Sequence, residues 1–178
     1  MKPAYAIEGT QGHPLHPPLT DVVIGAYAVA TLGVVLGALG VSEAEMASVW
    51  WIALLVGLGA TVPAALTGFW DWLKITVGTP LWRTATLHLA VMVSAAVLLG
   101  LAALFGHDRY VSGELGGGTL VLTLVGFGLL TIGGWLGGSI VFVHGMRVLG
   151  RLDEPTASAI APVPHGQRPR EREPSPRR

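Results

Sequence analysis

The histidines of this chain are the side chains whose types and spacing could do chemistry. His13 and His16 lie three positions apart in the stretch GHPLHPP, and each is followed by a proline. His88 and His144 stand much further along, each within or at the end of a long apolar stretch. Neutral imidazoles bind transition metals and haem iron, and they also relay protons. The chain has no cysteine, so thiolate metal sites, iron–sulfur clusters and covalently attached haem are excluded within it.

The spacing of His13 and His16 limits what this first pair can do. A residue before proline is driven out of the α region, which predicts that both histidines are extended. In a polyproline-II segment, imidazoles three residues apart point the same way, roughly 9 Å from each other. Metal–imidazole bonds are only about 2.0–2.1 Å long, so one ion cannot take both rings unless the segment turns. A simpler interpretation stays open: a stiff polar entrance to a helix that Pro17 or Pro18 begins.

Long apolar stretches must position these side chains. The composition is 51% hydrophobic and only 12% charged, against about 25% charged in typical soluble domains. A helix that crosses the hydrocarbon of a bilayer needs about 20 predominantly apolar residues. We therefore predict an all-α integral membrane bundle of four helices, up-down-up-down, within a domain over residues 19–149. Its predicted spans cover residues 19–40, 47–69, 82–105 and 119–144, with Trp50, Trp51, Trp70, Trp72 and Trp82 at their ends, as in interfacial aromatic belts.

An even number of spans sets the orientation. Both termini and the loop over residues 71–80 then share one side, which holds ten of the eleven lysines and arginines, while Arg109 lies on the other. The positive-inside rule predicts that both termini are cytoplasmic. The N-terminal segment 1–18 is therefore cytoplasmic. So is the tail 150–178, which is rich in proline and arginine and is predicted to be disordered.

The same topology gathers the histidines. His13, His16, His88 and His144 all fall at the cytoplasmic end, and His88 lies about two turns inside its helix. Ionisable groups at membrane depth usually face the interior or a water-filled cavity, which makes His88 the strongest candidate. A neutral histidine that only packs helices together is the alternative.

Glycines and two charges accompany the histidines at this end. Gly133 and Gly137 precede His144 on one helical face, which predicts either close helix packing or room for a flat cofactor. Asp71 and Arg83 flank the 71–80 loop and are expected to form an ion pair that closes the hairpin. Alternatively, the planar fork of Arg83 binds a propionate, a phosphate or a quinone oxygen.

Four motifs, taken together, resemble a known family. They are GHPLHPPLTDVVIGAY, ALTGFWDWL, WRTATLHLAV and GGWLGGSIVFVHGMRV, and they occur in this order. Over residues 12–149 the chain is similar to small predicted bacterial membrane proteins, the domain of unknown function 2231. The resemblance implies a four-span helical protein of the bacterial inner membrane and supplies no activity. It places seven residues at characteristic positions of the family: His16, Asp71, His88, Gly133, Gly137, His144 and Gly145.

Three functions are compatible with these residues. The first is an electron-transfer module that binds b-type haem through His88 and His144, with His16 as the substitute ligand and Arg83, Gly133 and Gly137 beside the cofactor. The second is metal or proton handling by His13, His16, His88, His144 and Asp71. The third is a non-catalytic subunit without a cofactor, which packs against a larger complex through its glycine faces.

Other classes of function lack their motifs. The chain has no dinucleotide-binding or phosphate-binding glycine loop and no nucleophile elbow, so we predict no catalytic residues and no enzyme activity of the chain by itself. The formal net charge is zero, and no basic stretch is interleaved with aromatics, so nucleic acid is not an expected partner. The expected partners are the lipid bilayer and either further copies of the chain or a membrane redox protein.

Overall fold

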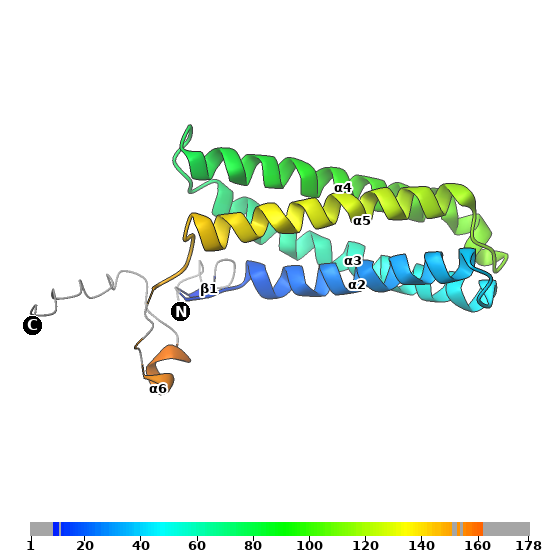
Figure 1. Ribbon diagram of the computed structural model, residues 1–178, viewed down its shortest axis with the longest axis horizontal. Helices are drawn as coiled ribbons and strands as arrows, with labels where there is room; N and C mark the ends of the chain where they lie inside the picture. Colours follow the sequence, from blue (N-terminus) through cyan, green and yellow to red (C-terminus); the bar gives the residue numbers. More distant parts are fainter. Residues whose placement is uncertain (1–8, 11, 151–152, 154, 162–178) are drawn as a thin grey trace, which may run out of the picture.

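The computed structural model describes residues 9–10, 12–150, 153 and 155–161 of the chain (Figure 1). Long helices dominate this part of the molecule, which confirms the predicted all-α four-helix bundle. The predicted disorder of the tail falls mostly on residues outside the described ranges. The elements are β1 (Gly9–Thr10), β2 (His13–Pro14), α2 (His16–Ala38), α3 (Glu43–Trp72), α4 (Pro80–Val111), α5 (Gly117–Gly138), the π-helical turn η1 (Ser139–Val143) and α6 (Thr156–Ala159).

The four long helices run up-down-up-down. α2 packs mainly against α3, and α4 packs mainly against α5, while fewer contacts join α3 to α4 and α2 to α5. α2 and α4 are therefore diagonal to each other across the bundle. Both begin at the same end, where α3 and η1 finish (Figure 1). We call this the histidine end and the opposite one the far end. Each long helix is long and apolar enough to cross a membrane.

Local sequence explains where the helices begin. The Thr79 hydroxyl accepts a hydrogen bond from the Trp82 backbone N–H at 3.1 Å, and Pro80 occupies the first helical position of α4. α2 begins at His16, with prolines in its first turn. The prediction of an extended conformation is thus confirmed for His13, which lies in β2, and wrong for His16. The tertiary contacts of the His16 ring, described below, outweigh the local preference.

The core contains a few large side chains among many small ones. Trp50, Tyr27, Leu54 and Leu99 are fully buried between the helices. The Trp50 indole N–H donates a hydrogen bond to the Thr123 hydroxyl at 3.1 Å, which links α3 to α5. The prediction that Trp50 belongs to an interfacial belt is therefore wrong, because a buried indole can satisfy its one polar atom inside the bundle.

The two hairpins, α2–α3 and α4–α5, repeat one packing arrangement. A Cβ atom added at Gly57 of α3 would lie 2.5 Å from the Tyr27 ring of α2, and one at Gly126 of α5 would lie 2.8 Å from Leu99 of α4. Tyr27 and Leu99 are 72 positions apart, and the two glycines are 69 apart. Since α2 and α4 start at the same end, an approximate two-fold rotation about the bundle axis relates the hairpins.

Candidate functional site

A cavity of about 800 Å³ lies at the histidine end, and all four long helices line it. Pockets that bury small molecules and cofactors in proteins have volumes of about 300–1,000 Å³ and mostly apolar walls. The wall here is also largely apolar, and glycines of α3 and α5 form part of it. Its titratable and charged members are His13, His16, Asp21, Asp71, His88 and Arg147.

His16 is anchored to α3 through one ring nitrogen. Its Nδ1 lies 2.9 Å from the Ala64 carbonyl oxygen and 3.3 Å from the Thr67 hydroxyl oxygen. A carbonyl oxygen only accepts hydrogen bonds, so Nδ1 carries the proton and donates it. In the neutral ring, Nε2 is then a lone-pair acceptor.

His88 repeats this arrangement in the second hairpin. Its Nδ1 donates to the Gly133 carbonyl oxygen of α5 at 2.8 Å, which again leaves Nε2 as the unprotonated nitrogen. Among the described residues, no hydrogen bond involves Nε2 of either ring, and both histidines line the cavity. The side chains of His16 and His88 line the same cavity.

A glycine lies against each ring, one helical turn after the carbonyl that anchors it. A Cβ atom at Gly68 would come within 2.6 Å of Cε1 of His16, and one at Gly137 within 3.2 Å of Cε1 of His88. The two histidines are 72 positions apart and these glycines 69, the same offsets as in the core. The two-fold relation of the hairpins therefore extends to the site, with one imidazole supplied by each half.

This geometry prepares both imidazoles to act as ligands. Metal-binding histidines commonly donate the second ring N–H to a backbone carbonyl or carboxylate, which fixes the tautomer and raises the basicity of the ligating nitrogen. The described residues include no group of three His, Asp or Glu side chains that could hold a metal ion.

The charges at the cavity differ from the predicted ones. Asp71, at the end of α3, forms a hydrogen-bonded ion pair with Arg147, and the two side chains are only 12% and 17% exposed. The predicted pair of Asp71 with Arg83 is therefore wrong, and Arg83 is exposed in the first turn of α4. Arg147 and the nearby Gly145 both have positive φ angles, which turn the chain back over the histidine end after η1.

His144 lies apart from the cavity, unlike its predicted partner His88. Its Nε2 is 3.1 Å from the Thr84 hydroxyl oxygen of α4, and His144 is not among the described residues that line the cavity. The prediction that His144 shares a helical face with Gly133 and Gly137 assumed a continuous α-helix. η1 is instead a π turn, whose i→i+5 hydrogen bonds change the direction in which the following side chains point. His88 instead shares the cavity with His16, and Gly137, predicted to share a face with His144, lies beside His88.

The sequence analysis did not predict the role of three groups that shape the site. The Ala64 carbonyl and the Thr67 hydroxyl bond the His16 ring, and Arg147 contributes the guanidinium of the cavity wall. Every residue has a backbone carbonyl, so the residue type does not indicate which carbonyl will accept the hydrogen bond. The repeated offsets of 72 and 69 positions could have paired Ala64 with Gly133, but the residues at equivalent positions are mostly different.

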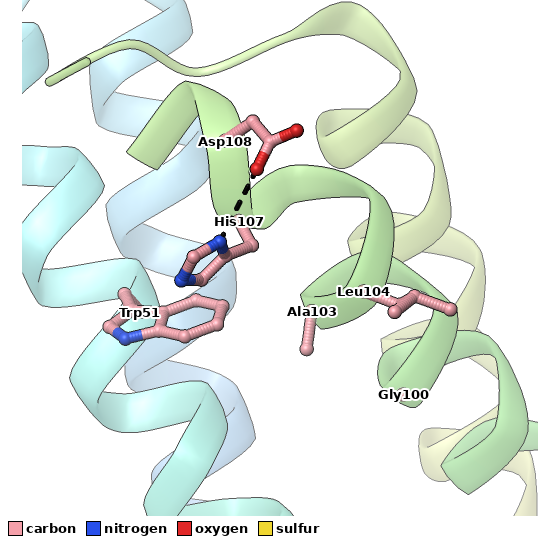
Figure 2. Close-up of a pocket in the computed structure, with 6 residues that line it drawn as sticks. All are labelled: Trp51, Gly100, Ala103, Leu104, His107 and Asp108. Atoms are coloured by element: carbon pink, nitrogen blue, oxygen red, sulfur yellow. Dashed lines mark hydrogen bonds and ion pairs between the residues drawn. The ribbon is translucent and has the colours of Figure 1, made fainter. Parts of the chain in front are cut away.

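A second hollow, of about 520 Å³, lies at the far end (Figure 2). His107 there contacts the Trp51 ring with centroids 5.2 Å apart, and its Nδ1 lies 3.4 Å from an oxygen of Asp108. The Asp108 side chain is fully exposed, and that of His107 is about half exposed. This hollow lacks the anchored, enclosed nitrogens of the histidine end. Its lining residues are Trp51, Gly100, Ala103, Leu104, His107 and Asp108.

Comparison with known proteins places nearly the whole bundle in one family. The family model described as "Predicted membrane protein (DUF2231)" matches residues 12–150, which include all four long helices and both anchored histidines. No curated protein and no solved structure matches the chain.

Proposed function

The chain belongs to the DUF2231 family of predicted membrane proteins, and we propose that it is a membrane-embedded module in which His16 and His88 would hold b-type haem. The observation that carries the proposal is the matched anchoring of two imidazoles, each donating Nδ1–H to a carbonyl of the neighbouring helix. Held by these two imidazoles, haem would supply one-electron chemistry, and the activity we propose is therefore electron transfer.

The shape of the cavity supports a flat, apolar ligand. A macrocycle needs helix surface without side chains close to its iron ligands. Gly134 and Gly138 of α5 line the cavity, and a Cβ atom at Gly134 would meet nothing within 4 Å. His16 and His88 come from diagonal helices, so both hairpins contribute one imidazole to the proposed site.

Ion transport has less support. Beyond the histidines the interior is filled by Tyr27, Leu54, Leu99 and Trp50, and the buried polar residues of the described bundle are threonines. A site at one end of a bundle whose interior is filled suits the binding of a ligand better than the passage of an ion. A subunit that carries no cofactor and only packs against a larger complex is the outcome expected if haem binding fails.

We also propose that the histidine end faces the cytoplasm from the inner membrane, with both termini on that side. Among the described residues, Lys74, Arg83 and Arg147 lie at the histidine end and Arg109 at the far end. The positive-inside rule then orients the bundle. A membrane redox partner would exchange electrons with the haem from the cytoplasmic side. Reporter fusions at each terminus should both read cytoplasmic, and opposite readings would overturn the orientation.

The test of haem binding is an absorption spectrum of the full-length protein, purified in detergent after haem-supplemented expression. We expect a Soret band, a sharp α band on reduction, one haem per chain and a low-spin bis-imidazole signal in electron paramagnetic resonance. His16→Ala and His88→Ala should each abolish the low-spin species. The matched controls His107→Ala and His144→Ala should retain it.

Two results would overturn the assignment. A wild-type protein without a Soret band after reconstitution would exclude haem binding. Loss of the low-spin species in His144→Ala but not in His16→Ala would show that His144, directly after η1, is the ligand in place of His16.

A further inference from the structure

Arg147 gives the cavity a charged edge. It is the one lysine or arginine among the described residues that line the cavity, whose wall is otherwise mostly apolar. The segment after η1 brings it there, since Met146, Val148 and Leu149 line the same cavity. Arg147 has a φ of 63°, a conformation that residues other than glycine seldom adopt. Arg147 therefore combines an uncommon backbone conformation with an ion pair to Asp71.

The chemistry of this edge indicates a ligand with an acidic group. A guanidinium presents a planar fork of donors that matches a carboxylate and binds it in a bidentate way. In the structure Asp71 supplies that carboxylate, because a largely buried cation without a counterion would be costly. A ligand with an apolar body and a carboxylate at its rim would complement both the walls and the edge.

We propose that Arg147 binds a carboxylate of the ligand, namely a haem propionate, which replaces Asp71 as the partner of the guanidinium. This inference rests on the proposed function, since it names the group that Arg147 recognises on the same ligand. Asp71 and the propionate then compete for one guanidinium of the cavity lining. Arg83, the candidate that the sequence indicated for this role, has no part in it because it lies exposed outside the cavity lining.

The experiment compares haemin with its dimethyl ester, in which both propionates are masked. Each is titrated into full-length apoprotein in detergent, and the Soret band reports binding. The wild type should bind haemin more tightly than the ester. Arg147→Gln should weaken the affinity for haemin by about tenfold or more, the usual scale for a charge-assisted hydrogen bond, and leave the ester unchanged. Arg83→Gln, the matched control, should change neither affinity.

Variants of Asp71 show whether a weaker affinity of Arg147→Gln for haemin comes from the lost contact or from misfolding. Asp71→Asn should tighten the binding of haemin, because it removes the competing carboxylate. The double variant Asp71→Asn/Arg147→Gln leaves no unpaired buried charge and should show the same weakened binding of haemin as Arg147→Gln alone.

The outcomes separate this inference from the proposed function. If the double variant binds haemin as tightly as the wild type, Arg147 does not bind a propionate. The same follows if Arg147→Gln lowers the affinities for haemin and for the ester equally. Equal affinity of the wild type for haemin and the ester would have the same meaning, while haem binding itself would stand. If neither compound gives a Soret band that depends on His16 and His88, the proposed function fails first.

Discussion

The two hairpins of this protein use one plan of contacts with different residues. In each, a histidine donates Nδ1–H to a carbonyl of the partner helix, and a glycine lies one turn beyond that carbonyl. The contact is tighter in α2–α3, where a Cβ at Gly68 would lie 2.6 Å from the ring, than in α4–α5, where one at Gly137 would lie 3.2 Å away. The comparison teaches that the backbone geometry, the histidine and the glycines are repeated, although most other residues at equivalent positions differ.

The hairpins also differ in how they hold their deeper contacts. In α2–α3, Tyr27 packs on Gly57 and its hydroxyl lies 2.9 Å from that of Thr61. At the equivalent place in α4–α5, Leu99 packs on Gly126 with apolar contact alone. The first half therefore combines close packing with hydrogen bonds, and the second relies on close packing.

The largest expected difference between the halves concerns the ring glycines. Gly68→Ala should weaken haem binding by about 100-fold, and Gly137→Ala by about tenfold, the range seen when groups that orient a metal ligand are lost. The reason is the shorter approach at Gly68, which forces the His16 ring off its carbonyl. Haem titration of both variants measures the ratio. Equal losses, or a larger loss at Gly137, would contradict the asymmetry of the two contacts.

The next difference concerns packing in the core. Gly57→Ala should destabilise the bundle by about 2 kcal/mol and Gly126→Ala by about 1 kcal/mol, within the usual range for overpacking. The Tyr27 ring is rigid at 2.5 Å from the added atom, whereas the Leu99 branch at 2.8 Å can rotate. Thermal unfolding in detergent compares the two, with Gly25→Ala as the control, because its added Cβ meets nothing within 4 Å.

A smaller effect is expected from Tyr27→Phe. This change removes the hydroxyl contact with Thr61 and keeps the ring on Gly57, so the loss should be about 1 kcal/mol or less, as for other interhelical hydrogen bonds in membranes. Unfolding by denaturant in detergent measures it. If stability falls as far as in Gly57→Ala, the hydrogen bond rather than the packing holds this contact.

The smallest expected effect belongs to Thr67→Val. His88 is held by a carbonyl alone, whereas His16 has both a carbonyl and the Thr67 hydroxyl. If the carbonyl suffices in both halves, this variant should weaken haem binding only about twofold, the scale of one weak interhelical hydrogen bond. A tenfold loss in haem titration would mean that the first hairpin depends on a contact that the second does not have.

The family, the helical class and the placement of the histidines were predictable from the sequence. Apolar stretches of sufficient length predict spans whatever their neighbours are, and the parity of four spans carries His16 and His88 to one end of the bundle. This reasoning depends only on counting residues along the chain. The imidazoles could thus be proposed as one cluster before any helix was packed.

Which members of the cluster meet was decided by the tertiary structure. The rotation of each helix about its axis follows from packing on its neighbours, and this turns His16 rather than His144 toward the cavity shared with His88. The π turn and the left-handed residues after it bring Arg147 to Asp71 in place of Arg83. The sequence determines how far along the bundle each side chain lies, because length and polarity are local properties. Only the packed fold determines which way it faces, because that depends on all four helices together.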